Sequence, residues 1–263
     1  MNDVDRESVR KTYQLCRLSY FFLSASLVLA SMAAIILTAA ILGDRRLILW
    51  YRSSPLSEWI STIIVWAMLL GTMLLWGRWE QKSWQRRVGL LLLMCLVDLV
   101  LWFMERSAAQ GNGAIGWFPD NLGLALGWAE FALVASLTGD YLVHLGAERA
   151  DESARSIRSL AATGAVVWML HFCEATNWDG GWPLQARMLG PQGQLLFLGW
   201  HLIWTICLIQ VSALVLAAFS HSNRVLGEME KEDRESDPLA HPSESSHRDL
   251  LATMPSRGTG PFM

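Results

Sequence analysis

Six ionisable residues in this 263-residue chain lie inside or beside long apolar stretches, where they could carry chemistry. They are four acids and two histidines: Asp98, Glu105, Glu130, Glu174, His171 and His201. A charged side chain at the centre of a bilayer costs roughly 3 kcal/mol, so such groups face protein or water and are functional candidates. Carboxylates and imidazoles together can relay protons, bind a cation or coordinate a metal ion. We therefore expect these residues to form a buried polar site.

Four of these six residues are predicted to lie at the same depth in the membrane. With a rise of 1.5 Å per helical residue, four of them lie about 10 to 12 Å below the predicted outer surface. These four are Asp98, Glu130, His171 and His201. Glu174 is shallower, at about 6 Å, and Glu105 lies at the boundary. Four different helices thus present an acid or an imidazole to one layer in the outer half of the membrane.

Several chemistries fit this layer. His171, Glu174, His201 and Glu130 are suitable ligands for zinc, manganese or iron, and haem could be held between the two histidines. The His-x-x-Glu spacing of His171 and Glu174 places both groups on one side of a helix, although no second copy of the spacing occurs. A proton or cation pathway is the second possibility. The third is structural, because buried polar groups often only bond across helices, at about 0.6 kcal/mol per pair.

The elements that position these residues are membrane-spanning helices. The chain is 52% hydrophobic and 17% charged, whereas a soluble domain carries about 25% charged residues. Six apolar stretches contain none of the Lys or Arg residues, and each is close to the roughly 20 residues that cross a bilayer. They are residues 18–42, 59–77, 88–104, 122–145, 159–178 and 194–220. We predict an all-α, polytopic transmembrane bundle of six helices.

The basic residues predict the orientation of this bundle. Lys and Arg accumulate in the cytoplasmic loops of membrane proteins. The N-terminal segment, the loops after the second and fourth stretches, and the tail hold 4, 4, 3 and 5 of them, against 3, 1 and 1 in the other three loops. The split of 16 to 5 predicts that both termini are cytoplasmic, in a cell (cytoplasmic or inner) membrane. Residues 1–17 are then a cytoplasmic segment, and the polar residues 221–263 a disordered cytoplasmic tail.

Tryptophan and glycine suggest further packing features. Of 14 Trp residues, nine fall at predicted outer ends, as expected for an interfacial aromatic belt. They are Trp50, Trp59, Trp102, Trp117, Trp128, Trp178, Trp182, Trp200 and Trp204. Gly123 and Gly127 should let a neighbouring backbone approach, and Ser24, Ser31 and Thr38 should turn inward on one stripe. Leu-Gly-Trp recurs at 126–128 and 198–200, which raises the possibility of a duplicated hairpin.

The function classes that remain are a non-catalytic membrane component, a small proton- or cation-coupled transporter, and a metal- or haem-bearing membrane enzyme. The first is favoured, with a subunit, scaffold or sensor as its form, because the sequence contains no phosphate loop, nucleophile elbow or paired cysteine metal motif. The lipid bilayer is the expected partner, along with membrane proteins reached through the Trp-rich outer loops or the tail. No nucleic-acid binding is expected, because the basic residues are scattered flanks of helices.

Overall fold

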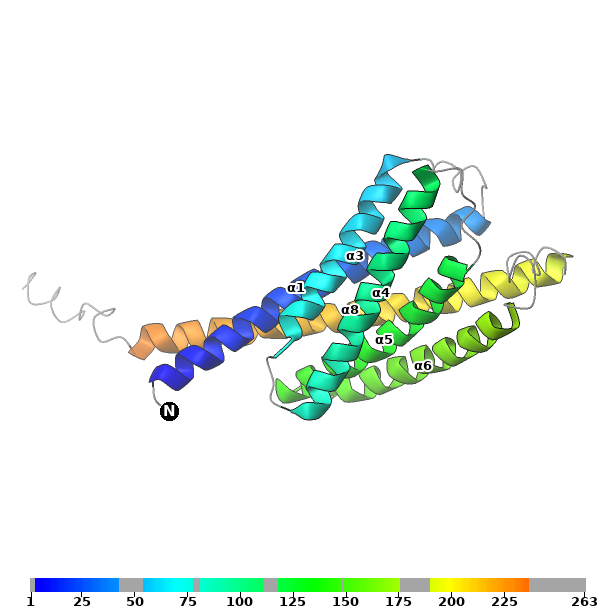
Figure 1. Ribbon diagram of the computed structural model, residues 1–263. Helices are drawn as coiled ribbons and strands as arrows, with labels where there is room; N and C mark the ends of the chain where they lie inside the picture. Colours follow the sequence, from blue (N-terminus) through cyan, green and yellow to red (C-terminus); the bar gives the residue numbers. More distant parts are fainter. Residues whose placement is uncertain are drawn as a thin grey trace, which may run out of the picture.

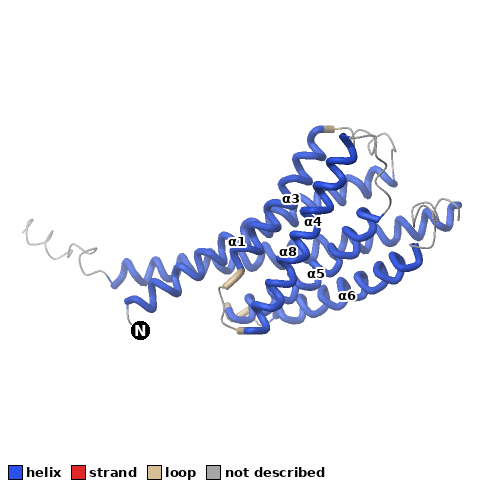
Figure 2. Tube along the Cα trace, viewed as in Figure 1, coloured by secondary structure: helices blue, strands red, loops and turns tan. Residues whose placement is uncertain are grey.

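The computed structural model describes residues 3–42, 54–77, 81–110, 118–147, 149–175 and 190–236. Side chains are described over residues 7–39, 54–77, 81–104, 106–107, 122–147, 149–166, 168 and 198–232. The described part is all helical and contains no strand (Figure 2). Its six helices are α1 (Asp3–Leu42), α3 (Pro55–Leu75), α4 (Lys82–Gln110), α5 (Phe118–His144), α6 (Arg149–Ala175) and α8 (Gly190–Ser236). The all-α prediction is confirmed.

Five of these helices are long and apolar enough to cross a membrane, which fits a multi-pass membrane protein. The candidate spans are Glu7–Ala39, Pro55–Leu75, Lys82–Met104, Leu122–His144 and Leu198–Glu232. Among the described residues, α6 does not qualify, although it carries most of the predicted stretch 159–178. Its first ten residues, 149–158, are mostly polar or charged.

Consecutive helices run in opposite directions, so the first and last helices begin and end at the same end of the bundle (Figure 1). Ser19 and Ser26 of α1 donate hydrogen bonds to the carbonyls of Gly71 and Ile64, which makes α1 and α3 antiparallel. Side-chain contacts also show that three further pairs of helices are antiparallel: α1 with α8, α4 with α5, and α5 with α6. We call the end that holds the start of α1 and the finish of α8 the termini-bearing end.

Helices α1 and α8 extend beyond the other four as a two-helix stalk (Figure 1), comprising residues 3–12 and 224–236. Residues 221–236, which the sequence places in the polar tail, continue α8, and residues 237–263 lie outside the described part. The start of the stalk is marked by Tyr13, whose hydroxyl lies 3.5 Å from Nε2 of His144 in the last turn of α5. With 47 residues, α8 is about 70 Å long, well beyond the roughly 40 to 45 Å of a whole bilayer.

Local sequence fixes the helix ends at the turns. The Ser54 side chain accepts a hydrogen bond from the backbone N–H of Leu56, and Pro55 occupies the first helical turn of α3. Gly146 has a φ of 84°, and the hydrogen bonds Ala147 N–H to Leu142 and Gly146 N–H to Val143 complete a Schellman motif after α5. This turn sends the chain directly back into α6, which packs along α5.

The outside of the bundle is apolar. On α4, the exposed residues Leu90, Leu93, Leu96, Val100 and Phe103 form a stripe at helical spacing. Aliphatic side chains are likewise exposed along α1 and α8. An apolar outer surface of this extent is typical of a protein surrounded by lipid.

Candidate functional site

The structure brings two of the predicted acids together. Asp98 of α4 and Glu130 of α5 interact through their side chains, and the Cys95 thiol lies against the same Glu130 carboxyl. Cys95 in turn lies 3.7 Å from the hydroxyl of Thr72 on α3, measured from sulfur to oxygen. We call Thr72, Cys95, Asp98 and Glu130 the acidic cluster. It joins three consecutive helices through polar side chains.

Glu130 is the centre of the acidic cluster. Its side chain is 6% exposed, and its Oε1 atom has no hydrogen-bond partner among the described residues. Asp98 is half-buried at the edge of the packed face of α4, while Thr72 and Cys95 are buried. Glu130 is ten residues, or about 15 Å, from Asp140 at the termini-bearing end. With Asp140 at the predicted inner boundary, this distance corresponds to the middle of a roughly 30 Å hydrocarbon core.

A buried carboxyl oxygen without a partner is costly, by about 1 to 3 kcal/mol for a neutral group and more for a charged one. A protein tolerates two buried acids side by side where a proton, a cation or water shares the site and offsets this cost. The arrangement can therefore exchange a proton between two carboxyls, or hold one small cation.

His201 of α8 is separate from the acidic cluster. Its ring hydrogen-bonds to the backbone of Ala34 on α1. The preceding residue, Trp200, points in another direction and stacks on Trp168 of α6. Glu130 faces α4, so the structure does not bring these two predicted metal ligands together. Among the described side chains, no group of three His, Cys, Asp or Glu residues could hold a metal ion.

The other three predicted site residues are placed only as backbone. Glu105 lies in α4, and His171 and Glu174 lie in the last turns of α6, but their side chains are outside the described residues. Because Trp168 stacks on Trp200 between antiparallel α6 and α8, the His171 backbone lies at about the level of residue 197, one turn from His201. The His201 ring, however, turns toward α1 and not toward α6. This orientation gives no support to haem held between the two histidines.

Three of the tryptophans at the predicted outer ends, Trp128, Trp200 and Trp204, form a cluster with Trp168. Trp128 is completely buried, with ring centroids 4.8 Å from Trp204 and 5.7 Å from Trp200. Trp200 stacks on Trp168 at 5.7 Å with an interplanar angle of 8°. The interfacial prediction is therefore wrong for Trp128, because helices α5, α6 and α8 converge at this level and bury its ring, whereas Trp200 and Trp204 pack against it and stay half-buried. Trp59 remains exposed, whereas Trp50, Trp117, Trp178 and Trp182 lie outside the described residues.

Glycines make room for this cluster in a way the sequence does not indicate. A Cβ at Gly127 would lie 2.7 Å from the Trp204 ring, and one at Gly164 would lie 2.5 Å from the Trp128 ring. A Cβ added at Gly123 would meet no described atom within 4 Å. The prediction that Gly123 and Gly127 admit a neighbouring backbone is therefore wrong, since an aromatic ring fills the space beside Gly127. Helices α5 and α6 approach closely at another glycine, where a Cβ at Gly139 would lie 2.5 Å from the Ala154 Cβ.

The serine and threonine stripe of α1 turns inward, as predicted. Ser24, Ser31 and Thr38 are all buried. Ser31 meets Ser212 of α8 at 2.8 Å, and Thr38 meets Thr205 at 3.3 Å. Each of these four hydroxyls also lies within hydrogen-bond distance of a carbonyl one turn earlier in its own helix. In each pair, one hydroxyl can therefore donate to its partner while the other donates to its own helix, so the seam between α1 and α8 is polar but satisfied.

An ion pair lies at the termini-bearing end between α4 and α5. Arg87 donates hydrogen bonds to Asp140 at 2.5 Å and to Ser136 at 2.7 Å. The sequence predicts Asp140 at the inner boundary of the membrane, and this partner gives a physical reason for an acid there. The sequence did not identify Cys95 as a neighbour of Glu130, although its i−3 spacing from Asp98 was a usable signal.

No protein-family model, curated protein or solved structure matches this chain.

Proposed function

We propose that the chain crosses the membrane six times and keeps both termini in the cytoplasm. The alternating directions of the six helices support an even number of crossings, because α1 and α8 then start and finish on one side. The termini-bearing end also gathers Lys82, Arg86 and Arg87 with Arg149, Arg155 and Arg158, in agreement with the rule that positive charge stays inside. In this assignment α6 crosses with its apolar second half, and its polar first turns lie at the cytoplasmic boundary.

Within that topology, the protein is a non-catalytic component of the cell membrane, with the stalk as the surface for a cytoplasmic protein partner. The carrying observation is that α1 and α8 continue past the end of α5 as one paired unit. Arg10 and Glu230 form an ion pair at 3.5 Å between the two helices. Along the helices, Glu7 pairs with Lys11 at 2.7 Å and Glu228 with Arg224 at 3.3 Å.

The exposed residues of the stalk are mainly charged, so its outer surface suits a polar, charge-complementary partner more than lipid. Exposed ion pairs contribute little to folding, typically 0.2 to about 1 kcal/mol. Keeping two helices about 15 to 20 Å beyond the membrane is therefore hard to explain by stability alone. In a scaffold, subunit or sensor, the stalk would serve as a rigid element that projects into the cytoplasm and binds the partner.

Site-specific photo-crosslinking in cells tests this function. A photoreactive amino acid at Val9, which is exposed on the stalk, should give one crosslinked protein of defined mass. The same amino acid at Val166, which is exposed on α6 within the bundle, is the matched control and should crosslink lipid only. Lipid-only crosslinks at both positions, or the same protein at both, would contradict a stalk that binds a partner.

The acidic cluster favours a second candidate, a proton or cation site. Glu130 with its unpartnered Oε1 beside Asp98 is the specific observation. Dicyclohexylcarbodiimide reacts with protonated carboxyls in apolar surroundings, so it should label Glu130 in the intact protein and not in Glu130→Gln. If the site carries protons, acidification of proteoliposomes across a pH gradient should be lost in Glu130→Gln and kept in Asp140→Asn. Equal flux in Glu130→Gln and the unmodified protein would remove this candidate.

A further inference from the structure

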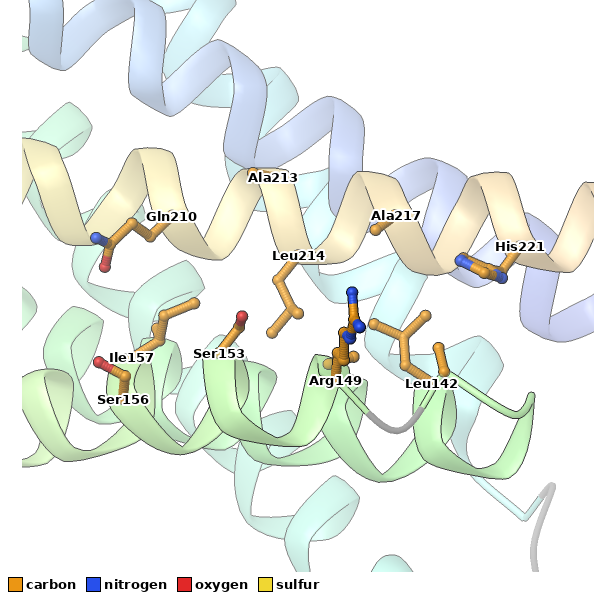
Figure 3. A pocket seen from close by; sticks show the side chains of 12 residues that line it. Leu142, Arg149, Ser153, Ser156, Ile157, Gln210, Ala213, Leu214, Ala217 and His221 are labelled. Carbon is orange, nitrogen blue, oxygen red and sulfur yellow. The ribbon is translucent and has the colours of Figure 1, made fainter.

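A groove between α6 and α8 opens at the termini-bearing end of the bundle (Figure 3). Its volume is about 620 Å³, which is within the range of about 300 to 1,000 Å³ usual for ligand pockets. The floor is apolar and includes Leu142, Ile157 and Leu214, which are buried. His221 lies at one end of the groove and Gln210 at the other, with Arg149 between them on the α6 side (Figure 3).

Small side chains create this groove. Ala213 and Ala217 stand one turn apart on α8, Ser153 faces them from α6, and Ala150 also lines the groove. The two helices are held in contact further along, where Trp168 stacks on Trp200.

The length of the groove corresponds to one leaflet. From His221 to Gln210 is eleven residues of α8, or about 16 Å. Half of a hydrocarbon core of about 30 Å is 15 Å. His221 lies beside Ser222, whose hydroxyl meets that of Tyr141 in the last turn of α5, so this end of the groove is at the membrane boundary. The groove therefore runs from the boundary to the middle of the bilayer.

The charge at the mouth is positive. None of the twelve side chains that line the groove is an acid. Arg149 forms no ion pair with any described residue, whereas the nearby Asp151 is paired with Arg155 at 2.6 Å. Basic pockets between transmembrane helices at the cytoplasmic face suit anionic lipid headgroups.

We propose that this groove binds one anionic phospholipid of the adjacent leaflet. Its phosphate lies at Arg149 and His221, and one acyl chain follows the apolar floor toward Gln210. If both termini are cytoplasmic, as proposed above, this leaflet is the cytoplasmic one. The lipid-binding site itself does not depend on that topology.

Native mass spectrometry of the full chain tests the proposal. The protein is purified with phosphatidylglycerol or with phosphatidylcholine of the same acyl chains, and the lipid bound per protein is counted. We expect one retained phosphatidylglycerol and little phosphatidylcholine. Arg149→Gln should lower phosphatidylglycerol retention about fivefold, the effect expected for one basic residue near an anionic surface. Arg86→Gln, at the same end of the bundle but outside the groove, is the matched control and should leave retention unchanged.

A second pair of variants tests the acyl channel. Ala217→Phe fills the groove and should remove bound lipid, whereas Leu216→Phe, on the exposed side of the same turn, should not. Thermal melting of each variant in detergent verifies that it is folded. Equal retention of both lipids, or full retention in Ala217→Phe, would overturn the proposal. So would a dimer mass that disappears in Ala217→Phe, since it would identify a second copy of the chain as the occupant.

Discussion

Replacing Gly164 by alanine should destabilise the bundle by crowding the buried ring of Trp128. The added Cβ would lie 2.5 Å from Cδ2 and Cε3 of that ring and 2.9 Å from Cε2. The ring has no room to retreat, because it is completely buried and is backed by Trp204 at 4.8 Å. Inserting a methyl group into a well-packed core typically costs about 1 to 3 kcal/mol.

The matched control is Gly199→Ala. Gly199 is also helical and also lies beside a tryptophan in sequence, but an added Cβ there would meet nothing within 4 Å. Both variants gain the same helix propensity, up to about 1 kcal/mol. The difference between their free energies of unfolding therefore isolates the packing cost. We expect Gly164→Ala to be less stable than Gly199→Ala by about 1 to 3 kcal/mol, or roughly 5- to 150-fold in the unfolding constant.

Reversible unfolding in mixed micelles of increasing SDS content, followed by circular dichroism, measures this difference. A double-mutant cycle gives a second check, since Trp128→Leu removes the atoms that the new methyl group would strike. In that background Gly164→Ala should become neutral or stabilising. Equal stability of Gly164→Ala and Gly199→Ala, or an undiminished loss in the Trp128→Leu background, would refute the packing described for α5 and α6.

Three further outcomes are expected. Ser31→Ala and Ser212→Ala should show a coupling energy of about 0.6 kcal/mol in a double-mutant cycle, the usual value for a hydrogen bond between membrane helices, and zero coupling would mean that the α1–α8 seam is not formed. Arg87→Gln should cost no more than about 1 kcal/mol, because the Arg87 and Asp140 side chains are 26% and 45% exposed, and the loss should shrink in high salt. Glu130→Leu should leave stability unchanged or raise it by about 1 to 3 kcal/mol, since it removes a buried oxygen without a partner; a large loss on SDS unfolding would show that this carboxyl is a structural group instead.

The acidic cluster shows how far sequence reasoning reaches into the interior. Depth and helical phase follow from counting along one helix, so the sequence alone assigns both acids to a shared layer. Counting cannot give the lateral positions of helices, which depend on which faces pack. The meeting of Glu130 with Asp98 and Cys95, and the turn of His201 toward α1, are therefore properties of the packed bundle.

The structure departs from the sequence-based expectations at residues 221–236 and at Trp128 for related reasons. Composition averaged over residues 221–263 describes a disordered tail, yet residues 228–232 are strong helix formers, and α8 continues to Ser236 beside α1. The preference of tryptophan for membrane boundaries is an average over single helices. It fails for Trp128, because three helices converge there and bury the ring more effectively than an interface could.

By itself, the sequence determined the all-helical class and the long apolar helices that fit a multi-pass membrane protein, because these depend on the transfer energy of short segments. It also contained the charge asymmetry on which the proposed orientation is based. Only the tertiary structure decided which acids share a site, which glycines admit a tryptophan ring, and where small residues on two helices leave a groove. Those features depend on contacts between residues far apart in the chain, and no local pattern specifies them.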